Sequence, residues 1–375
     1  MALIGPRADL SRAATLLGQC TDFGRLVDLA SQHGVRVPLV HGLSRLGWQG
    51  VPGRERERLE IFRRSHVVRA LSLAEELARI AKRFETAGIP FAAFKGATLA
   101  VSLYGDLAAR EYNDNDILIP RDRLDDAEHE LAQLGYRGRQ GDRAFRRAFL
   151  GHLRQYAFVH PDVDAYVDLH WGFAGRHLPF PLAVDDVWPH LRNVRVVGTD
   201  VPALAEPDLA LLLAGHGTKE AWRCLMWVGD FATLVVRAPT IDWPGVYERA
   251  RRQGCANAVL LGCAMASRLL DVSAPPALAG ILAGSDRVRK LAGRMAAPLA
   301  AGVSERAETM ADFDLCDRSW DKARAALRLL VTPTASDHDA WPMPRQMWGL
   351  YWLTRPLRLA GKALRRARPI GRRAN

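Results

Sequence analysis

The sequence predicts an α+β fold in which a small mixed β-sheet unit lies between two helical regions. Both end regions place apolar residues at helical spacing, whereas the middle has short apolar runs bounded by Gly, Pro and Asp. The 375 residues are too many for one simple core. We expect an N-terminal helical region at 1–87, an α/β core at 88–204, a C-terminal helical domain at 205–332, and a connector with a basic tail at 333–375.

The N-terminal region is predicted to contain two helices, at residues 8–32 and 54–87. In the second, apolar residues recur at roughly helical spacing from Leu59 to Ile80. The run Gly88-Ile89-Pro90 then ends this helix, because Gly and Pro are helix-stopping residues.

The middle region is predicted to alternate short strands with helices. An Ala-rich helix is expected from Thr98 to about Tyr104, and an amphipathic helix from Arg123 to Leu134, where Gly135 suits a helix C-terminus. The candidate strands are residues 91–94 and 114–119, a hairpin of 156–159 with 166–170, and 194–197.

The pattern becomes helical again from residue 206 onward. Pro207 suits a helix start, and Leu209, Leu212 and Leu213 supply an apolar face. Helices are expected to continue to about residue 331, before the Pro- and Asp-containing connector 333–344.

The composition is that of a soluble globular protein, with 49% hydrophobic and 25% charged residues. No apolar stretch approaches the roughly 20 residues needed to span a bilayer. The N-terminus lacks the basic-then-apolar pattern of a secretory signal. The five cysteines form no Cys-x-x-Cys pair, so we expect reduced thiols in a cytoplasmic protein.

The net charge of +11 is concentrated near the C-terminus. Beyond Asp339 the chain has nine basic and no acidic residues, and the rest carries 43 basic against 41 acidic residues. A basic surface that coats nucleic acid is therefore not indicated. The tail from Arg355 to Arg373 is compatible with a basic amphipathic helix that contacts an anionic membrane or nucleic acid, although such an end is more often a solvated, partly frayed terminus.

Asp114 and Asp116 are the most informative residues of the core. They are separated by one residue and are followed by a short apolar run, 117–119, that reads as a buried strand. Alternate side chains of a strand point the same way, so both carboxylates are expected on one face, about 7 Å apart at the Cα level, with Asn115 turned away. Ionised carboxylates at this spacing repel one another. A hard divalent cation relieves the repulsion. The pair therefore predicts a Mg²⁺ site, which usually serves phosphate chemistry.

Further motifs follow in order along the chain: Lys95-Gly96 before a helix, Asp114-x-Asp116, Val167-Asp168-Leu169-His170-Trp171, and His216-x-x-Lys219-x-x-Trp222. This ordered set resembles the uncharacterised bacterial nucleotidyltransferase family of the DNA polymerase β superfamily. The similarity extends over roughly residues 20–362. A chance Asp-x-Asp would not also bring the other motifs in this order.

The resemblance implies that the sheet unit is a nucleotidyltransferase core. Carried over to this sequence, Gly96 forms the turn before the first helix, Asp114 and Asp116 are metal ligands, and Asp168 is a third carboxylate on a neighbouring strand. Two Mg²⁺ ions are implied, with Asp168 on the acceptor side, together with an NTP such as ATP as co-substrate.

The sequence departs from the family pattern at two positions. The turn reads Lys95-Gly96-Ala97 where the superfamily usually has Gly-Ser or Gly-Gly, and Asn115 is polar where the family commonly has an apolar residue. Lys95 and Arg110 are candidates for contact with the triphosphate, one as a point charge and one as a bidentate fork. Arg110 is also a candidate salt-bridge partner that organises the Asp-x-Asp strand.

His216 and Lys219 are three residues apart and share a helical face. Lys219 is a candidate for contact with the β- and γ-phosphates, or else a solvated lysine, and His216 is more often a buried core histidine than a catalyst. His170 either approaches the acceptor or packs beside the neighbouring Trp. Asp230 is expected to be structural.

The resulting hypothesis is a Mg²⁺-dependent nucleotidyltransferase that moves NMP from an NTP to a hydroxyl or phosphate. Members of the family that the chain resembles often accompany genes for peptide natural products, lasso peptides among them, so the acceptor is expected to be a small metabolite or a modified peptide. A protein side chain is open as well. Two alternatives are transfer of another group at the same metal site, a sugar or a phosphoryl group, and a non-catalytic module that binds nucleotide or peptide.

Overall fold

The computed structural model describes residues 1–300 and 316–367. The N-terminal region forms α1 (Leu10–Gly18), α2 (Phe23–Gln32), α3 (Arg36–Arg45) and the long α4 (Gly53–Thr86). The helix predicted at 54–87 is confirmed, whereas the single helix predicted at 8–32 is wrong. The chain breaks there because the Asp22 side chain accepts a hydrogen bond from the Arg25 amide and starts α2 as its N-cap.

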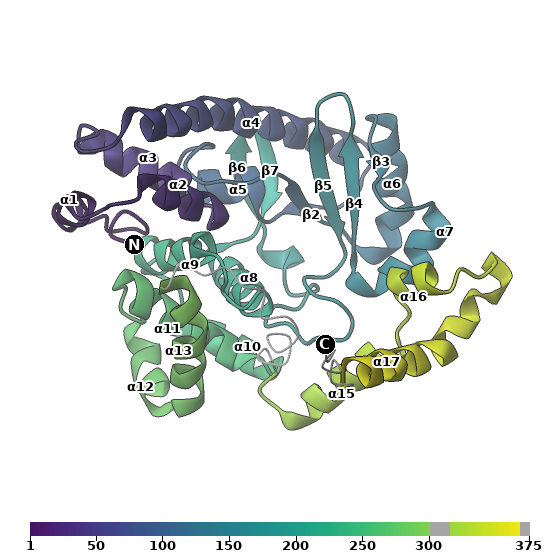
Figure 1. Cartoon of the computed structure of the whole chain (residues 1–375). Helices are drawn as coiled ribbons and strands as arrows, with labels where there is room; N and C mark the ends of the chain where they lie inside the picture. The colour runs from purple at the N-terminus through teal and green to yellow at the C-terminus, as the bar shows by residue number, and fades with distance from the viewer. Residues whose placement is uncertain (301–315, 368–375) are drawn as a thin grey trace, which may run out of the picture.

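One seven-stranded mixed sheet forms the core, with the strand order β3-β4-β5-β2-β1-β7-β6 (Figure 1). Strand β2 runs parallel to β5 and antiparallel to β1, and β4 and β5 form an antiparallel hairpin. The predicted α+β fold with a small mixed sheet is confirmed. The strands are β1 (Ala92–Ala93), β2 (Asn115–Leu118), β3 (Arg137–Gly138), β4 (Gln155–His160), β5 (Ala165–His170), β6 (Arg192–Val196) and β7 (Thr199–Ala203).

Two strands, β3 and β7, were not predicted. β7 pairs with β6 through a tight turn in which Val197 and Gly198 have φ angles of +44° and +76°. Such turns usually carry Asn-Gly or Asp-Gly, because a positive φ is unfavourable for β-branched residues. A valine at this position hides the turn signal in the sequence.

The two faces of the sheet bury separate apolar clusters. Ile117 and Val167 pack with the C-terminal half of α4, which crosses one face, while Leu118 and Phe94 pack with the C-terminal helices on the other (Figure 1). Alternation along β2 therefore directs Asp116 toward the C-terminal helices and away from α4. The connection after β1 consists of α5 (Gly96–Leu99) and a π-helical turn (Ala100–Tyr104), where the sequence predicted one regular helix.

Helices account for most of the chain after the sheet, and Pro207 lies in the first turn of α8 as expected. α6 (Leu124–Gln133) and the short α7 (Arg143–Phe145) belong to the sheet unit. The division of the chain at residues 88, 205 and 333 stays a prediction. The later helices are α8 (Glu206–Lys219), α9 (Leu225–Arg237), α10 (Trp243–Arg252), α11 (Ala256–Leu270), α12 (Pro276–Gly284), α13 (Asp286–Ala300), α15 (Ser319–Val331), α16 (Ala335–Ala340) and α17 (Tyr351–Ala367).

The first part of the predicted basic tail is packed rather than frayed. Arg355 is buried, and its Nη1 lies 2.6 Å from Asp337, which Arg358 also contacts at 2.6 Å. The last part of that tail, 368–375, lies outside the described residues. None of the helices in the described ranges is both long enough and apolar enough to cross a membrane.

Candidate active site

The turn between β1 and α5 requires a glycine. Gly96 has a φ of +54°, and a Cβ added to it would lie 2.8 Å from the carbonyl oxygen of Asp114. Both the left-handed backbone and the close approach of the β2 segment exclude a side chain at this position. The turn therefore brings Lys95 and the backbone before β2 together, in agreement with the assignment of Gly96 to this turn.

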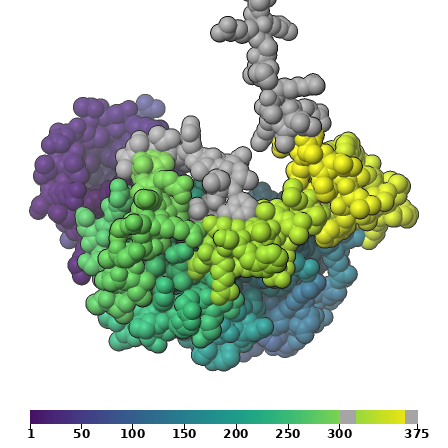
Figure 2. Space-filling model, turned by 90° about the horizontal axis from the view of Figure 1, so that it is seen from below, coloured from purple at the N-terminus to yellow at the C-terminus, as the bar shows by residue number. Residues whose placement is uncertain are grey.

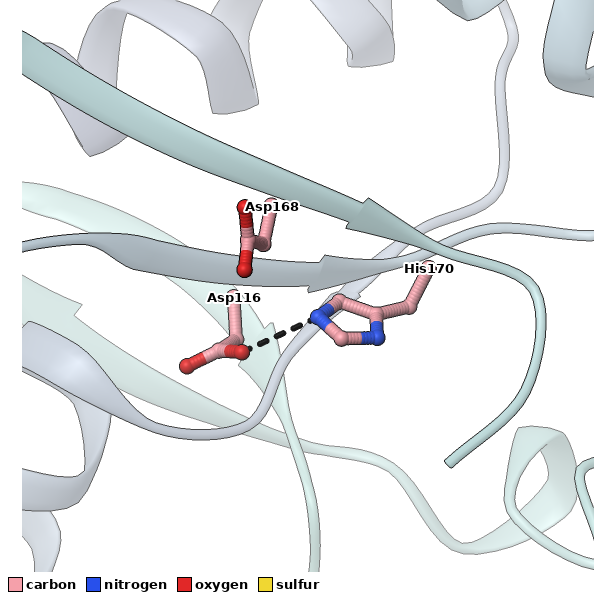
Figure 3. Close-up of side chains that lie close together, drawn as sticks. All are labelled: Asp116, Asp168 and His170. Atoms are coloured by element: carbon pink, nitrogen blue, oxygen red, sulfur yellow. Dashed lines mark hydrogen bonds and ion pairs between the residues drawn. The ribbon is translucent and has the colours of Figure 1, made fainter. Parts of the chain in front are cut away.

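Strand pairing places Asp116 beside Asp168. The two residues are direct Cα partners in the parallel β2–β5 register, and their side chains lie close together (Figure 3). Asp116 is buried, with 5% of its surface exposed, and Asp168 is partly exposed. Two acidic side chains at one register position of neighbouring buried strands are unfavourable unless cations compensate them.

Lys95 and His170 supply such compensation at Asp116. The Lys95 Nζ lies 3.3 Å and the His170 Nε2 3.0 Å from Oδ1 of Asp116 (Figure 3). Burial alone would raise the pKa of the Asp116 carboxyl, but the Lys95 ammonium and the hydrogen bond with His170 hold that pKa below its ordinary value. Asp168 lacks these close partners, and burial raises the pKa of its carboxyl.

Asp114 lies just before β2 rather than within it, and it lines the same cavity. Burial, followed by the charge of Asp116, raises the pKa of the Asp114 carboxyl to about 6. Asn115 points away from the cavity, as expected, and its amide donates a hydrogen bond of 2.9 Å to the carbonyl oxygen of Leu73 in α4. This bond explains why a polar residue is tolerated between the two aspartates.

His170 and Gln155 join the site. The sequence offered His170 as a residue that approaches the acceptor or packs beside the neighbouring Trp, not as a metal ligand, and it did not predict Gln155. One ligand atom each from Asp116, Asp168 and His170 lie within 4.8 Å of one another. Gln155, the Cα partner of His170 across the β4–β5 hairpin, has its Nε2 at 3.3 Å from the Asp168 carboxylate. The alternation along β5 was the available signal for His170, since it put this residue on the Asp168 face.

Arg110 forms a buried ion pair with Asp230 of α9. Its Nη2 lies 3.0 Å from Oδ2 and its Nε 3.3 Å from Oδ1 of that carboxylate, and the Tyr104 hydroxyl donates a hydrogen bond of 2.7 Å to Oδ1. Of the two roles considered for Arg110, this contact corresponds to that of a salt-bridge partner, although the partner lies on a helix far away in the sequence. The same ion pair agrees with the structural role expected for Asp230. Arg110 still lines the cavity, so contact with a triphosphate stays a prediction.

His216 and Lys219 face the carboxylates from α8. Both line the cavity, and the His216 ring packs edge-on against Trp227 at a centroid distance of 5.1 Å. Burial, together with the charges of Lys95 and Lys219, lowers the pKa of His216 well below its ordinary value. A neutral imidazole and a lysine therefore stand opposite the acidic strands.

The cavity between these elements has a volume of about 510 Å³. It brings together every residue that the sequence predicted for the site: Lys95, Gly96, Arg110, Asp114, Asp116, Asp168, His216 and Lys219. Their roles in binding and catalysis stay predictions.

A divalent cation fits this set of donors. Asp116 and Asp168 offer carboxylate oxygens, the ligands that Mg²⁺ prefers, with Asp114 next to them. His170 adds a nitrogen ligand that also suits transition metals. The Lys95 ammonium against Asp116 is itself a sign that the buried carboxylates favour a positive charge.

A model of the family described as uncharacterised nucleotidyltransferase matches residues 19–271. The chain belongs to this nucleotidyltransferase family. It is an enzyme of that class, as the resemblance implied, and the match spans all predicted site residues from Lys95 to Lys219. No curated protein matches the chain.

Two solved structures are similar to the chain at low identity. One is the antibiotic-resistance factor ANT(2'')-Ia, with 12% identity over 61% of this chain and 93% of that chain, and a TM-score of 0.28. The other is an antigenic nucleotidyltransferase-like protein from Paracoccidioides brasiliensis, with 16% identity over 44% of this chain and 76% of that chain, and a TM-score of 0.30. At these TM-scores we infer nothing from either.

Proposed function

We propose that this nucleotidyltransferase moves NMP from an NTP to a hydroxyl or phosphate oxygen of an acceptor, with Mg²⁺ held by Asp114, Asp116 and Asp168. The observation that carries the proposal is the register of β2 and β5, which sets Asp116 directly beside Asp168 in a cavity faced by Lys95 and Lys219. Carboxylates on one side and lysines around them suit a cation bound together with a polyphosphate.

In the proposed reaction the acceptor oxygen bonds to the α-phosphorus, the bond from that phosphorus to the β-phosphate bridging oxygen breaks, and pyrophosphate leaves. Bound Mg²⁺ would supply neutralisation of the charge on the phosphate oxygens. Asp168 accepts the proton of the acceptor hydroxyl as the general base. Lys95 and Lys219 position the triphosphate as point charges.

Lys95 has two partners in this scheme. Without a bound cation its ammonium is 3.3 Å from Asp116. A metal held by the carboxylates would compensate Asp116 and would leave Lys95 to the triphosphate. Lys95→Ala is therefore expected to weaken NTP binding in the presence of Mg²⁺, and isothermal titration calorimetry measures this; an unchanged NTP affinity would remove Lys95 from the site.

The acceptor we propose is a modified peptide or a small metabolite, in line with the gene neighbourhood of the family that the chain resembles. The five cysteines are free thiols, which favours the reducing cytoplasm as the place of action.

The test is a pyrophosphate-release screen over the four common NTPs, with cell extract as the acceptor source and mass spectrometry of the adduct. Label in the α-phosphate is expected to reach the acceptor. Transfer of γ-label or of a sugar instead would replace NMP transfer with the other group transfers. Metal-independent NTP binding without pyrophosphate release would replace catalysis with a binding module.

We assign a second partner, an anionic membrane, to the surface that α15 and α17 form near the end of the chain. α17 exposes Trp352, Leu353 and Leu357, and α15 exposes Trp320 and Leu327, next to a chain end without acidic residues. Apolar side chains beside basic ones suit the surface of an anionic membrane. The full chain is expected to co-sediment with vesicles of anionic lipid and Leu353→Glu/Leu357→Glu is expected to lose this binding; equal behaviour of the two proteins would reject the surface.

A further inference from the structure

A second polar cavity, of about 580 Å³, lies between the sheet unit and α15. We call it the arginine cavity. In Figure 2 the yellow-green α15 segment crosses the molecule between the green helices and the yellow C-terminal segment. Five arginines line the cavity: Arg121, Arg154, Arg176, Arg324 and Arg328. Asp122, Asp185 and Asp321 also line it, so positive charges outnumber negative ones.

No ion pair within the described part of the chain joins these arginines to the three carboxylates of the cavity. Within residues 1–300 and 316–367, only Arg328 among them makes a side-chain hydrogen bond, to the carbonyl oxygen of Arg176, and none forms an ion pair. Burial, followed by the charges of Arg176 and Arg328, lowers the pKa of the Arg154 guanidinium. Guanidinium groups gathered around one cavity repel one another, and a bound anion would relieve this repulsion.

An unpartnered buried donor points the same way. Trp171 lines the arginine cavity, only 7% of it is exposed, and its Nε1 has no hydrogen-bond partner among the described residues. A buried indole N–H usually has an acceptor. The arginine cavity thus combines cationic groups with a donor that lacks an acceptor.

The backbone is arranged to place Arg154 there. Arg154 has a φ of +60°, a left-handed conformation that costs energy for a residue with a side chain. A Cβ on Gly172 would lie 2.4 Å from Cδ of Arg154, so only a glycine leaves room for the arginine side chain.

The arginine cavity adjoins the carboxylate site. Arg154 lines the arginine cavity, and the next residue, Gln155, lines the carboxylate site. In the same way His170 lines the carboxylate site, and the next residue, Trp171, lines the arginine cavity. Phe173 and Phe180 line both. The two cavities meet at β4, at β5, which carries Asp168, and at the segment that follows β5. A ligand in the arginine cavity therefore approaches the site from the side that we assign to the acceptor.

We propose that the arginine cavity binds a phosphate group of the acceptor, so that the substrates of this enzyme are phosphorylated molecules whose reacting oxygen reaches the carboxylate site. This inference rests on the proposed nucleotidyl transfer. Phosphate fits better than a carboxylate because it carries a charge of about −1.5 to −2 at pH 7 and has oxygens for several guanidinium forks. The acceptor is bound here through its charge, while the NTP occupies the adjoining cavity.

Inorganic tripolyphosphate is the probe for this site, titrated calorimetrically into the full chain in EDTA. Without a divalent cation the carboxylates repel the anion from the catalytic cavity. We expect binding of one tripolyphosphate, and a Kd raised about tenfold or more in Arg176→Gln/Arg324→Gln, because charge-assisted hydrogen bonds are lost. Both arginines are exposed, so this variant keeps the fold.

Arg195→Gln/Arg251→Gln is the matched control, since it removes the same charge at exposed positions outside both cavities. It is expected to bind tripolyphosphate like the wild type, as is Lys95→Ala. Trp171→Phe, which keeps an aromatic side chain but removes the N–H donor, is expected to weaken binding. No binding by the wild type, equal loss in the control, or loss in Lys95→Ala alone would overturn the inference.

The same variants separate this inference from the proposed function. If the enzyme releases no pyrophosphate with any NTP, nucleotidyl transfer fails while tripolyphosphate binding still decides the arginine cavity. If transfer occurs and the arginine variants bind tripolyphosphate normally, the cavity assignment alone is wrong.

Discussion

The ion pair between Arg110 and Asp230 connects the segment before β2 to α9, so its removal is expected to destabilise the protein. The side chains of these residues are 7% and 1% exposed. Asp230→Asn keeps the shape of the side chain and one acceptor for the Tyr104 hydroxyl, but it leaves the Arg110 guanidinium buried without a counter-charge. Removal of one partner from a buried pair costs about 3–5 kcal/mol of unfolding free energy.

We expect Asp230→Asn to fall near the lower end of that range, at about 3 kcal/mol, because the amide oxygen still accepts a hydrogen bond. Urea unfolding followed by tryptophan fluorescence measures the loss. The loss of unfolding free energy in Arg110→Met/Asp230→Asn is expected to be about 2 kcal/mol smaller than the sum of the losses in the two single variants, since no unpaired charge remains.

A loss below about 1 kcal/mol in Asp230→Asn, or full additivity in the double variant, would refute the importance of this pair. The same proteins test the other role of Arg110. If Arg110 also contacts the triphosphate, Arg110→Met raises the Kd for NTP and Mg²⁺ far more than Asp230→Asn does. Equal Kd values in the two variants would restrict Arg110 to its structural role.

Three more predictions follow from particular residues. Gly96→Ala is expected to lower the unfolding free energy by about 2 kcal/mol and to abolish pyrophosphate release, because Gly96 has a positive φ and an added Cβ would clash with the carbonyl oxygen of Asp114. Gly105→Ala is the control that keeps activity, since Gly105 has a φ of +79° but an added Cβ would meet nothing within 4 Å. Mg²⁺ is expected to raise the melting temperature of the wild type and to leave that of Asp116→Asn unchanged, since a ligand that binds only the folded protein stabilises it; an equal rise in both would exclude Asp116 as a ligand. Burial lowers the pKa of His177 to about 4. As the pH drops from about 6.5 toward 4, the unfolded chain binds a proton at this residue and the folded protein does not, so the unfolding free energy falls. His177→Gln is expected to reduce the dependence of the unfolding free energy on pH, and an unchanged dependence would contradict the lowered pKa of His177.

The fold was predictable where a local pattern determines it. The spacing of apolar residues gave α4, and the period-two alternation gave β4 and β5 as a hairpin. β7 was missed because its turn has Val197 at a position that usually carries Asn or Asp. The break between α1 and α2 was missed because a single Asp cap decides it.

The site was predictable as a set of residue types but not as a set of contacts. Strand alternation placed Asp168 and His170 on one face, yet only the strand order puts β5 beside β2 and so brings His170 within 3.0 Å of Asp116. Arg110 and Asp230 are 120 residues apart, and no local pattern signals such a pair. The arginine cavity likewise gathers side chains from segments that are far apart in the sequence.

We propose that nucleotidyl transfer depends on Asp116 and Asp168, which lie side by side on β2 and β5. Pyrophosphate release from α-labelled NTP by the wild type, Asp116→Asn and Asp168→Asn tests it most directly, with Asp162→Asn in the exposed β4–β5 turn as the matched control. We predict Mg²⁺-dependent label transfer by the wild type and the control, and a loss of about 100-fold or more in the two site variants. Transfer at wild-type rates by either site variant would contradict the claim.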